Sequence, residues 1–213
     1  MANKQTQIGV YVFAIMVSVI CATLFALNLM PIGQIDIDNF LAYRYELIAQ
    51  GEWWRLLSGN MLHTNLWHLL MNLAGFWVIL FLHETHYKQH SVKLAGLFLS
   101  LAMLEGLGLY WFYPELKGYV GLSGLLHGLF TFGALLDIRK GFKSGYLLLL
   151  GVIIKAGYET YFGASDSVSE LINARVATES HLIGVVSGLL CGLIWLPLSG
   201  YLKRAQTLST SHN

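Results

Sequence analysis

The sequence predicts an all-α membrane protein that crosses the lipid bilayer six times. Apolar residues make up 55% of the 213 residues, and charged residues only 12%; soluble domains carry about 25% charged residues. Six apolar runs have roughly 18–23 residues each, about the length that a helix needs to cross the hydrocarbon layer. They occupy residues 8–30, 64–82, 94–113, 119–136, 145–162 and 181–199. No linker or repeat separates them, so residues 1–213 are expected to form a single membrane domain.

Two of the runs need a separate justification. The run at 8–30 is longer than the apolar segment of a signal peptide, about 7–15 residues, and no small-x-small cleavage site follows it. It is therefore expected to remain as the first span. The run at 145–162 is the weakest because Lys155 and Glu159 interrupt it. These residues are four apart on one helical face, so they can pair with each other inside the membrane.

The basic residues between the runs predict the orientation, because Lys and Arg concentrate in cytoplasmic loops. With a cytoplasmic N-terminus, the inner segments hold eight of them: Lys4, Lys88, Lys93, Arg139, Lys140, Lys143, Lys203 and Arg204. The outer segments hold four: Arg44, Arg55, Lys117 and Arg175. The segment 137–144 contributes most to this difference. Both termini are therefore expected in the cytoplasm.

Four polar residues that are far apart in the sequence share one predicted depth. In this orientation the second, fourth and sixth spans all run from outside to inside. His68 and Asn72 lie early in the second span, and His181 begins the sixth. Ser123 lies about four residues into the fourth span, or about 6 Å along its axis. Polar side chains inside a membrane are costly, so this convergence in the outer half indicates a functional site.

Ser123 and His181 have the residue types of a nucleophile and its base. A serine reacts when a base takes its proton and hydrogen-bond donors stabilise the oxyanion that forms. Glycines at small-xxx-small spacing allow close helix packing, and they flank both residues: Gly121, Gly124 and Gly128, and Gly184, Gly188 and Gly192. His68 and Asn72, one turn apart, can donate to an oxyanion, together with a backbone N–H near Ser123. Alternatively, they are a polar pair that satisfies only its own turn.

Together these residues resemble the motifs of the rhomboid intramembrane serine proteases. The motifs are Trp54-Arg55 with His63 eight residues later, His68 with Asn72, Gly121-x-Ser123-Gly124, and His181-x-x-Gly184. Their order, their spacing and their assignment to spans two, four and six agree with that family. The resemblance covers most of the chain from Glu52 to Gly188.

The resemblance implies a six-helix rhomboid-like bundle with a role for each motif residue. Ser123 would be the nucleophile and His181 the general base of a dyad without an acid. His68, Asn72 and the backbone amide of Ser123 would form the oxyanion site. Structural roles would fall to Arg55, Gly121, Gly124, Gly184 and Gly188. The loop from Pro31 to His63, rich in Trp and Tyr, would lie partly in the outer leaflet, where such side chains are enriched.

One branch of the family is especially similar. The segments Gly121-Leu-Ser-Gly-Leu-Leu-His-Gly128 and Glu179-Ser-His181 look like those of the rhombosortases, bacterial rhomboids thought to process proteins with a C-terminal Gly-Gly-containing sorting tail. The implied partners are membrane-anchored proteins with a C-terminal transmembrane tail, cleaved near its extracytoplasmic end. No cofactor is implied. The implied location is the bacterial inner membrane, with the active site toward the periplasm. A general rhomboid with other single-span substrates is the alternative.

His127 departs from the usual rhomboid pattern, in which a tyrosine at this position packs on the catalytic histidine. Ser123 and His127 are four residues apart, so their Cβ atoms lie about 5–6 Å from each other. His127 is therefore a second candidate base, or a residue that stacks on His181 and orients it. The complete motif match assigns the base to His181, which favours the stacking or orienting role.

Three features of the sequence resemble those of other functions. His83-Glu84-Thr85-His86 resembles a zinc motif, but H-E-x-x-H needs histidines four apart. It lies in the first cytoplasmic loop, so a solvated loop and no metal site are predicted.

The alternative from a different class is a non-catalytic membrane protein, either a rhomboid-like binding protein or a transporter. In a transporter, the charged residues within the apolar runs could line an ion path: Glu105, Lys155 and Glu159. The repeated halves common in transporters are missing. The net charge of +1 gives no reason to expect nucleic acid as a partner.

Overall fold

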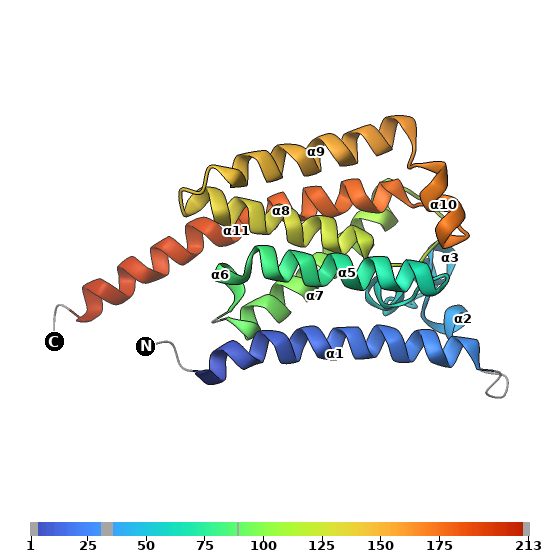
Figure 1. Cartoon of the computed structure of the whole chain (residues 1–213), viewed down its shortest axis with the longest axis horizontal. Helices are drawn as coiled ribbons and strands as arrows, with labels where there is room; N and C mark the ends of the chain where they lie inside the picture. Colours follow the sequence, from blue (N-terminus) through green and yellow to red (C-terminus); the bar gives the residue numbers. More distant parts are fainter. Residues whose placement is uncertain (1–3, 31–35, 89, 211–213) are drawn as a thin grey trace.

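Long helices lie side by side in a bundle, with the short helices α2, α3 and α10 at one end and α6 at the other (Figure 1). The computed structural model describes residues 4–30, 36–88 and 90–210, and the side chains of residues 9–195 within these ranges. The predicted lysines and arginine at 4, 203 and 204 have side chains outside this part, and Pro31 lies outside it entirely. The elements are α1 (Lys4–Leu29), α2 (Ile37–Leu41), β1 (Tyr43–Arg44), α3 (Tyr45–Ala49), α4 (Arg55–Ser58), η1 (Gly59–Met61), α5 (Leu66–Leu82), α6 (Glu84–Tyr87), α7 (Ser91–Phe112), β2 (Gly118–Tyr119), α8 (Ser123–Arg139), α9 (Ser144–Phe162), α10 (Asp166–Ile172) and α11 (Thr178–Thr210).

The described part of the chain is mostly helical, as predicted, and each of the six apolar runs coincides largely with a helix: α1, α5, α7, α8, α9 and α11. That all six cross the membrane stays a prediction. Among the described residues, three helical segments are by themselves long and apolar enough to cross a membrane: Gly9–Leu29, Ser91–Phe112 and Thr178–Trp195. Two bent pairs bring the number to five if each pair is one span. Arg55–Met61 meets α5 at 98°, and α9 meets α10 at 87°.

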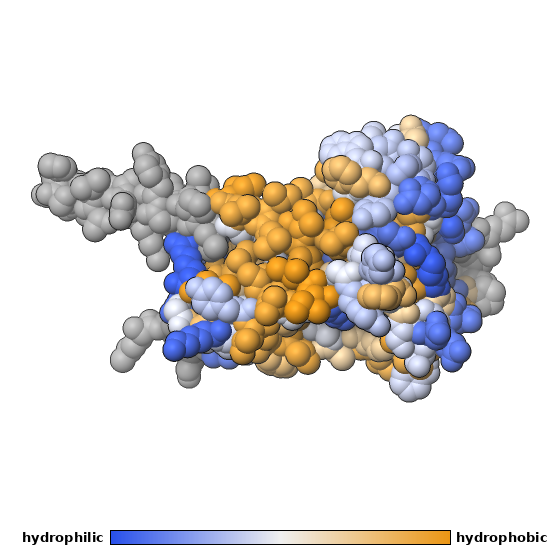
Figure 2. Space-filling view, turned by 90° about the horizontal axis from the view of Figure 1, so that it is seen from above, coloured by the Kyte–Doolittle hydropathy of each residue, from blue (hydrophilic) through white to orange (hydrophobic). Residues whose placement is uncertain are grey.

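The surface has the distribution of polarity that a membrane protein needs. Figure 2 shows one face, on which apolar residues form a band across the middle of the bundle and hydrophilic residues lie toward both ends. Several long helices turn large apolar side chains outward, among them Val12, Val78, Leu147 and Leu193. In water this exposure would be costly, whereas in lipid these side chains meet an apolar solvent.

The interior is built mainly where α5, α7 and α8 pack together, with α1 along one side. Phe76, Leu101, Leu125 and Leu129 are fully buried there. Cys21 joins this core from α1, and Cys191 is half-buried on α11; both are free thiols. Their predicted role as small apolar side chains therefore fits their surroundings.

A short antiparallel pair and a buried arginine fix the turn that precedes Ser123. Strand β1 pairs with β2, so that Tyr43 lies opposite Tyr119. The buried Arg55 guanidinium donates to the Ala42 carbonyl at 2.8 Å and pairs with Glu52 at 2.6 Å. The segment after α1 is thereby attached both to α4 and to the chain that enters α8.

Two predicted helix starts are wrong by about one turn. The apolar run at 119–136 predicts that Ser123 lies about four residues inside its helix, but α8 begins at Ser123. The reason is local: Tyr119 belongs to β2, and Gly121 has a φ of +130°, which a helix does not accommodate. Conversely, α11 begins at Thr178, so His181 lies one turn inside it and does not begin it.

The predicted solvated loop at His83 and His86 is also wrong. His83 ends α5 and is fully buried, in a space left by Gly133, where a Cβ would lie 2.3 Å from the His83 ring. Asp137 on α8 lies 2.6 Å from His86 Nε2 and 3.2 Å from His83 Nδ1. Short α6 thus folds back onto the end of α8. The absence of a metal site stays a prediction, although these three side chains form a group that could hold an ion.

Candidate active site

Helices α8 and α11 bring Ser123 and His181 together. The Ser123 hydroxyl and His181 Nε2 are 3.0 Å apart, within hydrogen-bonding distance. Glycines make this approach possible, because a Cβ on Gly184 would lie 1.9 Å from the Gly124 carbonyl oxygen. Likewise, a Cβ on Gly188 would lie 2.4 Å from the Gly128 carbonyl oxygen. The two backbones therefore touch where larger side chains would hold them apart.

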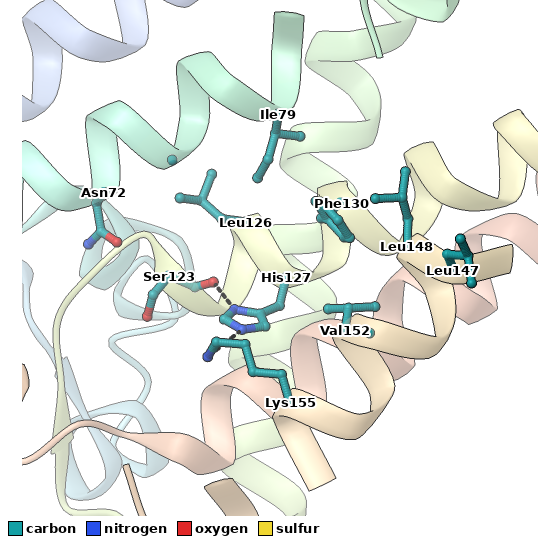
Figure 3. A pocket seen from close by; sticks show the side chains of 12 residues that line it. Asn72, Ile79, Ser123, Leu126, His127, Phe130, Leu147, Leu148, Val152 and Lys155 are labelled. Carbon is teal, nitrogen blue, oxygen red and sulfur yellow. Dashed lines mark hydrogen bonds between the residues drawn. The ribbon is translucent and has the colours of Figure 1, made fainter. Parts of the chain in front are cut away.

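His127 stacks on His181 and makes no hydrogen bond to the Ser123 hydroxyl. The two rings are 4.1 Å apart and inclined by 17°. His127 Nδ1 lies 2.8 Å from the Ser123 carbonyl oxygen, and its Nε2 lies 3.4 Å from Lys155 Nζ (Figure 3). A carbonyl oxygen only accepts and an ammonium only donates. The proton of His127 therefore belongs on Nδ1, and Nε2 accepts from Lys155.

Glu159 on α9 reaches the other nitrogen of His181. Its Oε2 lies 2.8 Å from His181 Nδ1, and its Oε1 lies 2.7 Å from Lys155 Nζ. The predicted pairing of Lys155 with Glu159 is thus confirmed. The contact between Glu159 and His181 was not predicted, and it differs from the expected dyad without an acid. The sequence did carry a signal for this contact, namely the charged pair inside an apolar run. Such a pair shows that the two residues share one face of α9, but it does not show which helix packs against that face.

His68 and Asn72 on α5 point to the turn in front of Ser123. A Cβ on Gly121 would lie 2.8 Å from His68 Nε2 and 3.6 Å from Asn72 Nδ2. Within the described chain, Asn72 Nδ2 is buried without a hydrogen-bond partner. The Thr64 backbone N–H donates to His68 Nδ1 at 3.4 Å, which leaves the ring proton on Nε2. Two N–H donors therefore lie next to the turn that leads into Ser123.

The turn itself is held from both sides. The Gly121 N–H donates to the Gly59 carbonyl at 3.0 Å, and the Tyr119 hydroxyl donates to the Gly121 carbonyl. Burial raises the pKa of the Tyr119 hydroxyl well above its ordinary value, so this donor keeps its proton. His63, from the preceding loop, packs edge-on against His68 with ring centres 5.0 Å apart. The backbone near Ser123 is therefore fixed in position.

Two cavities meet at Ser123. An apolar cavity of about 420 Å³ lies between α5, α8 and α9, and it is lined by Leu126, Phe130 and Val152, together with the polar Asn72 and Lys155 (Figure 3). A more polar cavity of about 480 Å³ reaches Ser123 from the other side, past His68 and Tyr119. An extended peptide passing from one to the other would cross the Ser123 hydroxyl.

Glu105 lies on the Tyr119 side of the turn before Ser123 and interacts with the Tyr119 hydroxyl. It is fully buried on α7, next to Gly124, where a Cβ would lie 2.0 Å from its Oε1. Lys155 and Glu159, in contrast, contact the two stacked histidines. The three charged residues considered for an ion path therefore lie in two different places, Glu105 beside Gly124 and the other two beside the histidines.

Comparison with known proteins identifies the family. Residues 50–198, more than half of the chain, match the Rhomboid domain. The chain belongs to the rhomboid family. This rhomboid is 28% identical over 162 residues to the rhomboid protease GluP of Bacillus subtilis, a match that covers 76% of this chain and 30% of GluP. It is also 28% identical over 188 residues to the rhomboid protease GlpG of Klebsiella pneumoniae, covering 88% of this chain and 64% of GlpG.

The chain thus spans less than a third of the length of GluP and just under two thirds of that of GlpG. The predicted membership of the rhomboid family is confirmed. The assignment to the rhombosortase branch stays a prediction, because neither relative carries that name.

Proposed function

We propose that this rhomboid is an intramembrane serine endopeptidase in which Ser123 is the nucleophile and His181 the general base. The observation that supports it most directly is the distance of 3.0 Å between Ser123 Oγ and His181 Nε2. A base within about 2.6–3.2 Å of a serine hydroxyl can take its proton during attack. The names of the two relatives agree with a protease.

The proposed reaction proceeds in two steps. Ser123 Oγ bonds to the peptide carbonyl carbon while its proton moves to His181 Nε2, giving a tetrahedral oxyanion. His181 then gives this proton to the leaving nitrogen as the C–N bond breaks, and an acyl-enzyme remains. Water, deprotonated by the same nitrogen, releases the acyl group as a carboxylic acid and restores the Ser123 hydroxyl.

The oxyanion would be stabilised by three N–H groups. His68 Nε2 and Asn72 Nδ2 face the turn before Ser123, and the unpaired Asn72 donor is available for a ligand. Ser123 is the first residue of α8, where backbone N–H groups lack a partner within the helix. The positive end of the helix dipole also favours negative charge at this point. Donors already in place lower the barrier most, because they need no rearrangement during the reaction.

The proposed topology has six spans in one membrane domain over residues 1–213. Helix α8 would be the fourth span; its 17 residues suffice because it lies largely inside the bundle. Helix α1 begins and α11 ends at the same end of the bundle, while α2, α3 and α10 lie toward the other (Figure 1). We assign the first end to the cytoplasm from the distribution of basic residues. The protein would then lie in the bacterial inner membrane, with Ser123 toward the periplasm.

The proposed substrates are membrane-anchored proteins with a C-terminal transmembrane tail that contains Gly-Gly. The apolar cavity between α5 and α9 suits an apolar segment, and cleavage needs that segment to leave its helix. Glycine favours this, because it lowers helix stability by about 1 kcal/mol relative to alanine. The resemblance of the Gly121–Gly128 and Glu179–His181 segments to rhombosortases supports the same class.

A serine-reactive fluorophosphonate probe tests the proposed activity. The purified wild type is expected to become labelled at Ser123, because an activated serine attacks phosphorus with loss of fluoride. The Ser123→Ala variant is expected to remain unlabelled with an unchanged thermal unfolding temperature. A folded wild type that takes up no probe would instead indicate a non-catalytic rhomboid-like binding protein.

The substrate class has its own test in cells. In a strain that carries Ser123→Ala, proteins with a C-terminal Gly-Gly-containing tail are expected to accumulate uncleaved, with the tail visible by mass spectrometry of their C-termini. A complementing wild-type copy should restore the shortened form. If the C-termini are identical in both strains, the rhombosortase assignment fails, while a general rhomboid protease with other substrates remains.

A further inference from the structure

We infer that Glu159 is a positioning residue for His181, so that the site works as a Ser123–His181–Glu159 triad. The inference depends on the proposed protease function, since it assigns a role in the same reaction. Its starting point is the contact of 2.8 Å between Glu159 Oε2 and His181 Nδ1, on the side of the ring away from Ser123. The two residues come from α9 and α11, 22 positions apart in the chain.

The first consequence of this contact concerns the tautomer of His181. An ionised carboxylate only accepts hydrogen bonds, so Nδ1 must carry the ring proton to bond with Glu159. Nε2 then has a free lone pair, and that lone pair faces the Ser123 hydroxyl at 3.0 Å. The opposite tautomer would place a proton where the base must accept one. Glu159 therefore selects the form of His181 that can deprotonate Ser123.

The second consequence concerns charge during the reaction. When Ser123 gives up its proton, His181 becomes an imidazolium inside the bundle, where unpaired charge is costly. Glu159 supplies a negative charge in contact with this ring and accepts from Nδ1 throughout, while the transferred proton stays on Nε2 until the leaving nitrogen takes it. His181 has only 5% of its surface exposed, so water can do little of this work.

Lys155 and His127 hold the carboxylate and the ring in place. Lys155 Nζ lies 2.7 Å from the second oxygen of Glu159 and 3.4 Å from His127 Nε2. His127 covers one face of the His181 ring at 4.1 Å. The ion pair with Lys155 uses only Oε1, so it does not account for the contact that Oε2 makes with His181. A closed set of contacts thus fixes both the position and the orientation of the base.

Isosteric substitution of Glu159 provides the test. Glu159→Gln keeps the size of the side chain and removes its charge, and its amide can donate to Nδ1, which selects the wrong tautomer. We expect kcat for a single-span reporter to fall about 10³–10⁴-fold with KM within about twofold, as when the triad carboxylate of a serine protease becomes an amide. Glu159→Asp, which restores the charge, is expected to recover at least about tenfold of that loss.

The controls separate this inference from the proposed function. Glu170→Gln, at an exposed position of α10, makes the same change of charge outside the site and is expected to leave kcat unchanged. Wild-type activity that depends on Ser123 must be present; without it, the protease proposal itself fails. Given that activity, a Glu159→Gln enzyme within about fivefold of the wild type overturns the triad. The triad is also overturned if Glu159→Gln loses activity together with thermal stability and Glu159→Asp does not recover that activity.

Discussion

Replacing His181 by alanine is expected to abolish proteolysis, whereas replacing His127 by phenylalanine is expected to leave a measurable enzyme. Among the described residues, His181 is the one base hydrogen-bonded to the Ser123 hydroxyl, and His127 has both ring nitrogens bonded elsewhere. Removal of the base of a serine protease costs up to about 10⁶-fold in kcat. Phenylalanine at 127 can still stack on His181 but loses the hydrogen bond to the Ser123 carbonyl. Such a bond contributes about 0.5–1.5 kcal/mol, or roughly tenfold in rate.

The measurement is kcat/KM for a single-span reporter, with thermal unfolding of each variant as the control for folding. Both substitutions remove an imidazole from the same stacked pair, so each serves as the comparison for the other. Equal and complete loss of activity in two stably folded variants would contradict the separation of roles. Retention of activity in His181→Ala would contradict the assignment of the base.

The long helices could be predicted from the sequence because lipid imposes a simple rule on it. A span needs a continuous apolar run, and the runs around Phe76, Leu101 and Val185 are visible without any tertiary information. The same holds for the close packing of α8 on α11, because glycines that recur every four residues allow two helix backbones to approach closely. Once α8 and α11 pack in this way, Ser123 and His181 are expected to lie close to each other.

What the sequence could not predict depends on contacts between distant short segments. Helix α8 begins at Ser123 because Tyr119 pairs with Tyr43 across 76 residues, and no periodic pattern in the sequence records this pairing. Glu159 carries a signal, since a charge inside an apolar run is costly. Its partner, however, depends on the rotation of α9 about its axis. The position of the carboxylate on His181 Nδ1 therefore had to come from the structure.

Replacing Gly184 by alanine is expected to separate α8 from α11 and to inactivate the protein. The added Cβ would lie 1.9 Å from the Gly124 carbonyl oxygen and 2.8 Å from its carbon. These are backbone atoms, so no side chain can rotate away and the helices themselves must move apart. Overpacking usually costs about 1–3 kcal/mol, and a clash with backbone belongs at the upper end. We expect a clear fall in the thermal unfolding temperature.

Gly96→Ala on α7 is the matched control, because a Cβ there meets no atom within 4 Å. The same added methyl group is expected to leave the fold intact and to favour the helix by about 1 kcal/mol. Equal unfolding temperatures for the two variants would show that α8 and α11 do not touch as closely as the glycine contacts indicate.

The loss of activity in Gly184→Ala should exceed what its loss of stability explains. Ser123 lies on α8 and His181 on α11, one turn before residue 184, so a shift that relieves the clash also lengthens the 3.0 Å contact between them. A misplacement of about 1 Å at a reacting centre can cost about 10²-fold in rate. The variant should therefore remain inactive even at temperatures where it is still folded. If the variant regains full activity at lower temperatures, where it is folded, then Gly184 contributes to stability but not to the position of the catalytic residues.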